Sequence, residues 1–298
     1  MTQNQTEQFH LIYGYKDNNI LRHSFNNLAQ MVFGINFESF YQSGFWNDRY
    51  DCYSYIDKGN IISNVSVNKL DMIINGKKVK ALQIGTVMTH PGYRGKGLAG
   101  KLMNYVLEKY ENEYEVIYLF ANKDVLDFYP KYGFKSLKQS QYIFDVKGKL
   151  SKGNRILKLD IMKDDDVKLI QKLANERKPV SRVFGIANAY HLIMFYCLYV
   201  FNECIYYIDN LDTIVIYKID YGDIHIYDII SKEQLDFTEF ISRIATGKEQ
   251  KVVFHFTPDF DDIESERILY DDSDDMFFVR SKTVNIPENL FHPITAHA

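Results

Sequence analysis

The sequence VMTHPGYRGKGLAG, residues 87–100, holds three glycines and two basic residues within its last seven positions. A strand-like apolar pattern at 79–88 leads into it. Beyond the turn, apolar residues recur at helical spacing: Leu98, Leu102, Met103, Val106, Leu107 and Tyr110. The pattern predicts a strand, a glycine-rich turn and a helix in direct succession.

A glycine-rich turn at the start of a helix is suited to binding an anion. The first N–H groups of a helix have no partner within it, and the helix macrodipole favours negative charge there. Glycine lets the main chain approach a ligand closely, and Arg94 and Lys96 can add charge-assisted contacts. We therefore expect this turn to bind a pyrophosphate. The alternative is a turn that only joins strand to helix, with both basic side chains in solvent.

Two nucleotide-binding motifs compete with this interpretation. The pattern GxxxxGK[ST] is absent, whereas GxGxxG is matched by Gly95, Gly97 and Gly100. The turn, however, follows a hairpin meander that includes the turn pair Asn75-Gly76, not a parallel strand–helix–strand unit. The next strand also ends in Ala121-Asn122 without the acidic residue of a dinucleotide site. A dinucleotide is therefore the less favoured ligand.

The turn resembles the GCN5-related N-acetyltransferase (GNAT) superfamily, whose signature [QR]-x-x-G-x-[GA] is met by Arg94, Gly97 and Ala99. A later family stretch, N-x-x-A-x-x-[LF]-Y-x-x-x-G-F, is met with Val125 in place of alanine by Asn122, Phe128, Tyr129, Gly133 and Phe134. The resemblance implies an α+β fold, with a central mixed, mostly antiparallel sheet flanked by helices. It also implies acetyl-CoA as a co-substrate.

By this resemblance, a defined set of residues holds the cofactor. The set is Val87, Met88, Thr89, Arg94, Gly95, Lys96, Gly97, Leu98, Ala99, Gly100 and Asn122. Tyr129 matches the family's usual general acid, and a phenol within hydrogen-bond reach can protonate the departing CoA thiolate. A core tyrosine is the alternative. The general base is left open between Glu38, Asp48, His90 and a water chain.

With 298 residues, 46% of them hydrophobic, the chain is long enough for two domains. The polar segment KGKLSKGN at 147–154 predicts the boundary, giving a GNAT domain of residues 1–148, with its final strand near 142–146, and a second domain of residues 154–298. The second half repeats the element order, with a connection around Gly185. The sequence SKEQ at 231–234 replaces the glycine-rich turn, so we expect a degenerate GNAT-like domain without a cofactor.

Composition excludes several classes of partner. A formal charge of −4 gives no basic excess for nucleic acid, and the apolar run at 192–201 is about half the length of a membrane span. Cys52, Cys197 and Cys204 form no CxxC pair, which argues against a metal site. The acidic tract 259–275 does not fit a calcium loop. Without a secretory signal at residues 1–7, we expect a cytoplasmic protein that uses no metal.

The sequence therefore predicts an N-acyltransferase in which an amine attacks acetyl-CoA directly. The aromatic segment 37–55 is expected to build the acceptor pocket, with Trp46 and one tyrosine lining it. One alternative is a non-catalytic acyl-CoA-binding module whose second half forms a homodimer or binds a partner. In another, the second half recognises the acceptor, which is then larger than a metabolite. Whether the amine-bearing acceptor is a small molecule or a protein is left open.

Overall fold

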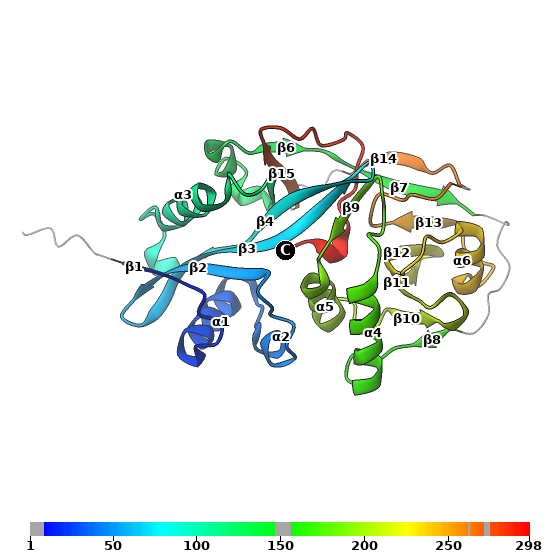
Figure 1. The fold of residues 1–298 in the computed structure, drawn as a ribbon, viewed down its shortest axis with the longest axis horizontal. Helices are drawn as coiled ribbons and strands as arrows, with labels where there is room; N and C mark the ends of the chain where they lie inside the picture. Colours follow the sequence, from blue (N-terminus) through cyan, green and yellow to red (C-terminus); the bar gives the residue numbers. More distant parts are fainter. Residues whose placement is uncertain (1–8, 147–155, 262, 271–274) are drawn as a thin grey trace, which may run out of the picture.

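The computed structural model describes residues 9–146, 156–261, 263–270 and 275–298. Figure 1 shows two halves side by side, each built on one β-sheet with helices packed against it. The carboxyl-terminal end of the chain lies at the centre of the molecule, between the halves (Figure 1). The predicted α+β class is confirmed.

The first sheet has eight strands within the described residues, in the order β1-β2-β3-β4-β5-β15-β6, with β9 paired to one end of β3. The strands are β1 (His10–Tyr13), β2 (Tyr50–Asp57), β3 (Asn60–Ile74), β4 (Lys77–Thr89), β5 (Val116–Ala121), β6 (Lys135–Leu137), β9 (Phe184–Ala187) and β15 (Met276–Ser281). Only the pair β4 and β5 is parallel. The sheet is therefore mixed and mostly antiparallel, as predicted.

Strand β3 corrects one prediction. The apolar pattern predicts separate strands at 61–67 and 72–74, but β3 is continuous. The polar residues between them stay in the strand because each side chain has a partner: Lys69 pairs with Asp51 at 3.1 Å and Asn68 bonds His191 at 2.8 Å. The predicted hairpin at Asn75-Gly76 does join β3 to β4, with both residues at positive φ.

Helices cover both faces of the first sheet. They are α1 (Asn19–Phe33), α2 (Glu38–Gln42) and α3 (Leu98–Tyr110), with short 3-10 turns η1 (Pro91–Tyr93), η2 (Lys123–Val125) and η3 (Tyr129–Tyr132). Helix α1 begins where the Asn18 side chain accepts hydrogen bonds from the first-turn N–H groups, and ends at Gly34 with φ +71°. Figure 1 shows α1 and α2 on one side of the sheet and α3 on the other.

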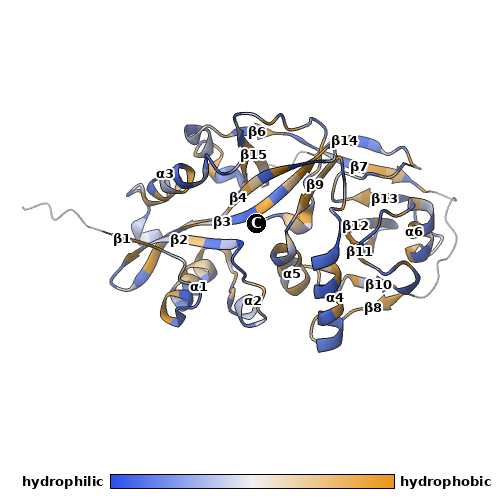
Figure 2. Ribbon diagram, in the orientation of Figure 1, coloured by the Kyte–Doolittle hydropathy of each residue, from blue (hydrophilic) through white to orange (hydrophobic). Residues whose placement is uncertain are grey.

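The second sheet runs β14-β7-β13-β12-β11-β10-β8. Its strands are β7 (Gln139–Asp145), β8 (Leu157–Lys158), β10 (Ile205–Ile208), β11 (Thr213–Asp220), β12 (Asp223–Ile230), β13 (Lys251–Phe254) and β14 (Glu266–Tyr270). The helices of this half are α4 (Asp164–Glu176), α5 (Tyr190–Tyr199) and α6 (Phe237–Ile244), with the 3-10 turns η4 (Asp209–Leu211) and η5 (Ile294–Ala296). Figure 2 shows α5 coloured largely as hydrophobic, whereas α4 carries a hydrophilic side.

The second half repeats the central unit of the first. Strands β12 and β13 are parallel and are joined through α6, as β4 and β5 are joined through α3. At the start of this connection the side chains of Lys178 and Glu233 pair at 2.8 Å, and Lys232 pairs with Asp212 at 2.7 Å. Ion pairs thus occupy the region that corresponds to the glycine-rich turn.

The two halves exchange strands. Strand β7, predicted to end the first half, lies between β13 and β14 in the second sheet, so that placement was wrong. In return, β15 from the carboxyl-terminal part inserts between β5 and β6, burying Phe277 and Phe278. The connection predicted around Gly185 is instead strand β9, which pairs with β3. The predicted boundary at 147–154 lies outside the described residues.

A buried ion pair joins the second sheet to the last residues of the chain. Arg177 makes two hydrogen bonds to Asp228, at 2.7 and 2.8 Å, and Asp228 also accepts one from the hydroxyl of Thr295. The Asp228 side chain is 1% exposed and that of Arg177 is 9% exposed. The network therefore fixes the position of the segment that follows Thr295.

We predict that Arg177→Leu lowers the free energy of unfolding by about 3–5 kcal/mol, because it leaves the Asp228 carboxylate buried without its cation. Urea unfolding measures the change. The matched control is Glu203→Gln, which removes the exposed pair between Lys158 and Glu203 and should leave the free energy of unfolding nearly unchanged. Equal losses in the two variants would contradict the assignment of the buried network.

No described helix has the length and apolar character needed to cross a bilayer. All three cysteines are free thiols. Within the described residues no group of His, Cys, Asp and Glu side chains is arranged to hold a metal ion.

Candidate active site

The site begins where two parallel strands separate. Strands β4 and β5 pair only from Ala81 and Val116 to Ile84 and Leu119. Beyond Ile84, β4 pairs only with β3, and the end of β5 pairs only with β15. The main chain of 85–89 on the side facing β5 therefore has no neighbouring strand in the sheet.

A β-bulge turns β4 away from β5 at this point. The register between β3 and β4 shifts after Ser66 and Gly85, and Thr86 has a positive φ of 47°. Two side chains hold this strained backbone: Asn64 Nδ2 donates to the Thr86 carbonyl at 2.9 Å, and the Thr86 hydroxyl is 2.9 Å from that of Tyr50. Bulges of this kind redirect a strand and commonly lie beside binding sites.

The glycine-rich turn places the start of α3 beside the separated strands. Gly95 and Gly97 have φ values of +78° and +72°, a region that side chains with a Cβ rarely adopt. Helix α3 has no side chain capping its first turn and no acidic residue there. Its first N–H groups can therefore bind an anionic ligand, as the sequence predicts.

A cavity of about 920 Å³ lies between the separated strands and extends toward the second half. It is lined by six of the predicted cofactor residues: Val87, Met88, Thr89, Arg94, Ala99 and Asn122. The remaining five, Gly95, Lys96, Gly97, Leu98 and Gly100, do not line it.

Two of these five have structural roles. The side chain of Leu98 is only 2% exposed and packs in the core, so this residue can offer a ligand only its main chain. Gly100 allows α3 to pack against η3, because a Cβ at this position would lie 2.6 Å from the Tyr132 hydroxyl. Lys96 is exposed, with its ammonium 5.2 Å from the ring centre of Tyr93.

Tyr129 lines the same cavity and is 5% exposed. Burial raises the pKa of its phenol to about 12, so the hydroxyl keeps its proton at neutral pH. Its ring packs against Phe128, Phe134 and Phe278, while no described residue makes a hydrogen bond to its hydroxyl. The hydroxyl is therefore available to donate a proton to a ligand.

The three candidate bases do not line the cavity. Asp48 pairs with Lys16, and that hydrogen bond lowers the pKa of its carboxyl group. His90 accepts a hydrogen bond from Gly92 N at 3.1 Å, in the turn before α3. Glu38 lies in a separate polar network. The structure therefore favours a base outside this set.

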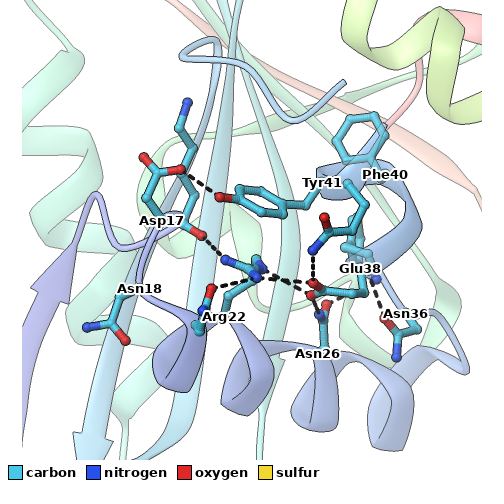
Figure 3. A network of polar contacts seen from close by, with 12 residues as sticks. Asp17, Asn18, Arg22, Asn26, Asn36, Glu38, Phe40 and Tyr41 are labelled. Carbon is cyan, nitrogen blue, oxygen red and sulfur yellow. Dashed lines mark hydrogen bonds and ion pairs between the residues drawn. The ribbon is translucent and has the colours of Figure 1, made fainter. Parts of the chain in front are cut away.

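Figure 3 shows that network, which joins α1 to α2. Arg22 donates to both carboxylate oxygens of Glu38, at 3.0 and 3.1 Å, and its guanidinium lies 3.7 Å from the ring centre of Tyr41. Asn26 bonds both Glu38 and the main chain of Phe37. The hydrogen bonds from Arg22 and then Gln42 lower the pKa of Glu38. Glu38 is therefore a structural residue that holds α2 in place.

A second group of cavity-lining side chains is apolar and mostly aromatic. It includes Phe33, Phe37, Phe40, Tyr50, Phe195 and Tyr196. The prediction that one tyrosine of the aromatic segment lines the pocket is confirmed by Tyr50. Trp46 does not line it, because its ring is buried in the core and its N–H donates to the Tyr50 carbonyl at 3.2 Å.

Sequence reasoning did not identify the residues that the second half contributes to the cavity. Helix α5 lines the cavity with Phe195 and Tyr196, and the chain end adds His297 and Ala298. Ala298 packs against the bulge, where a Cβ on Gly85 would lie 3.2 Å from it. No local motif marks these residues, which are brought to the site by the packing of α5 and by the buried network at Thr295.

Comparison with known proteins agrees with this site. The family model for the acetyltransferase (GNAT) domain matches residues 21–137, which include the separated strands, the glycine-rich turn and Tyr129. No curated protein matches the chain.

Solved structures resemble both halves. A probable N-acyltransferase from Enterococcus faecalis shares 16% identity over 92% of this chain and 73% of that one, with a TM-score of 0.56. A GCN5-related N-acetyltransferase from Kribbella flavida shares 15% identity over 92% and 71%, with a TM-score of 0.53. Another from Anabaena variabilis shares 14% over 91% and 73%, with a TM-score of 0.55. At these identities the likeness shows the fold.

A mixed sheet with separated parallel strands and a glycine-rich helix start defines an acyltransferase site. Residues 21–137 match the model of the GNAT acetyltransferase domain, so this part of the chain is a GNAT-type acyltransferase domain.

Proposed function

We propose that the protein transfers an acetyl group from acetyl-CoA to the nitrogen of an amine by direct attack. The observation that carries this proposal is the single cavity that connects the glycine-rich turn, the separated strands and Tyr129 with an apolar chamber. Such a cavity can hold donor, acid and acceptor together, which direct transfer requires.

The donor fits the first group of residues. A pantetheine arm can add to the unpaired edge of β4 at Val87, Met88 and Thr89, as an extra strand adds to a sheet. Its pyrophosphate then lies at the start of α3, where Arg94 adds positive charge. Asn122 lines the opposite side of the gap, at the end of β5.

The chemical step needs one base and one acid. The acceptor ammonium loses one proton, and the amine nitrogen then forms a bond to the thioester carbonyl carbon. As the C–S bond breaks, the CoA thiolate takes a proton from Tyr129, and the second proton lost by the nitrogen returns to the Tyr129 phenolate. The net products are the N-acetyl amine, CoA thiol and one proton released to solvent.

Direct attack is favoured over a covalent acyl-enzyme. No cysteine lines the cavity within the described residues, and burial raises the pKa of Cys52 to about 12. A thiol with such a pKa is a poor nucleophile at neutral pH.

The test incubates the full chain with acetyl-CoA, with and without a panel of primary amines, and follows CoA thiol release. Acetylated amine, confirmed by mass spectrometry, is the expected product. The intact mass of the protein after acetyl-CoA alone should be unchanged. An acetylated protein that passes its acetyl group to amines would contradict direct attack, and no acetylated amine would contradict the function.

A further inference from the structure

The acceptor end of the cavity is built by two halves of the chain. Phe37 and Phe40 come from the α2 region, and Phe195 comes from α5. The ring of Phe195 stacks on Phe37 with centroids 5.7 Å apart and meets the edge of Phe40 at 5.8 Å. All three line the cavity, so the second half closes the apolar chamber.

The charge of the wall argues against a polycationic acceptor. Among the described residues that line the cavity, two carry a carboxylate: Asp124, which lies beside Asn122 at the cofactor end, and Ala298 through its α-carboxylate. The chamber between α1, α2 and α5 has no Asp, Glu, Lys or Arg side chain in its described wall. A ligand with several ammonium groups would lose hydration there and find too few carboxylates to pair with all of them. An apolar body would instead bury its surface against aromatic rings.

Two polar side chains in the same wall have unsatisfied atoms. His191, on α5, and Asn68, on β3, are both 0% exposed and both line the cavity. His191 Nε2 lies 2.8 Å from Asn68 Oδ1. Since an amide oxygen can only accept, Nε2 carries the proton and Nδ1 is left as a bare acceptor. Within the described residues, neither His191 Nδ1 nor Asn68 Nδ2 has a hydrogen-bond partner.

This arrangement leaves one buried acceptor and one buried donor without partners within the described residues. Burial lowers the pKa of His191 to about 3, so the imidazole stays neutral and Nδ1 keeps its lone pair at working pH. Buried polar groups normally have partners, and the exceptions commonly mark a ligand site. An N–H group of a bound ligand would supply the hydrogen bond that His191 Nδ1 lacks.

We propose that the acceptor is a primary amine on an apolar, ring-sized body, with the body between the aromatic side chains of α2 and α5 and an N–H of the amine donated to His191 Nδ1. This inference rests on the proposed function and names its substrate class. His191 then binds the acceptor, and α5 sets the selectivity.

The first test compares kcat/KM for 2-phenylethylamine, ethylamine and spermidine with the full chain. Phenylethylamine should exceed the other two by at least about tenfold, since its ring buries apolar surface in the chamber. Spermidine as the best substrate would overturn the inference while leaving the proposed function intact. Turnover of none of the three would overturn both.

Two variants test which residues set the preference for an aromatic amine and bind its nitrogen. Phe195→Ala should reduce the preference for phenylethylamine over ethylamine about tenfold, and the control Leu198→Ala, on the same helix but outside the cavity wall, should keep it. His191→Phe should raise KM for phenylethylamine about tenfold while leaving the affinity for acetyl-CoA unchanged. Acetyl-CoA affinity also reports that each variant is folded. An unchanged preference in Phe195→Ala, or an unchanged KM in folded His191→Phe, would overturn the proposal.

Discussion

Acetyl-CoA should bind the intact protein saturably in calorimetry, and the double variant Arg94→Ala, Gly97→Glu should bind it at least about a hundredfold more weakly. Arg94 lines the cavity beside the start of α3, and Gly97 precedes the first helical residue with φ +72°. The variant removes one cation and places a carboxylate where the pyrophosphate is expected. It also strains the turn that presents the main-chain N–H groups, because glutamate rarely adopts this φ.

A matched control is needed for the backbone strain that a glutamate at position 97 introduces. Gly59 has φ +80°, and a Cβ there would meet no atom within 4 Å, as at Gly97. It lies in the turn between β2 and β3 and does not line the cavity. Gly59→Glu therefore adds the same charge and the same backbone strain away from the site, and should bind acetyl-CoA normally. Equal binding by all three proteins would leave the glycine-rich turn as a structural connection only.

Tyr129→Phe should lower kcat by about a hundredfold or more and leave the affinity for acetyl-CoA nearly unchanged. The phenol lines the cavity and no described residue bonds its hydroxyl, so its loss removes a proton donor without breaking a hydrogen bond within the described protein. The benzene ring, which packs against Phe134 and Phe278, remains. Single-turnover kinetics separate the chemical step from product release.

The control is Tyr105→Phe, the same change on α3 at a residue that packs against Tyr53 and does not line the cavity. It should retain full turnover. If Tyr129→Phe behaved like this control, Tyr129 would be a core residue and the acid would lie elsewhere.

The pKa of Tyr129 also predicts a pH dependence. With its pKa raised to about 12 by burial, the phenol is protonated at every pH below about 11. Loss of this proton lowers the rate only above that range, so Tyr129 should cause no fall in kcat between pH 7 and 10. A rise in this interval reports deprotonation of the acceptor amine or of its base. A decline of kcat with an apparent pKa near 9 that vanishes in Tyr129→Phe would contradict the assignment.

Local patterns predicted the catalytic half well. The helix predicted from its apolar residues between Leu98 and Tyr110 is α3, and the strand predicted to end at Ala121-Asn122 is β5. Gly95 and Gly97 of the turn have positive φ, which glycine adopts without strain. Where polar residues interrupt an apolar strand, as at Asn68 and Lys69, the pattern was misleading, because the partners that keep them in the strand lie far away in the sequence.

What the sequence by itself determined was the chemistry of the donor end, since the groups that would bind a pyrophosphate lie within seven consecutive residues and follow from main-chain geometry. The acceptor end was decided only by the tertiary structure. Strand exchange places β15 beside β5, the buried network at Thr295 fixes the chain end, and α5 brings Phe195 and His191 to a cavity whose other wall lies more than a hundred residues earlier. Contacts of this range depend on packing between whole elements, and no local periodicity records them.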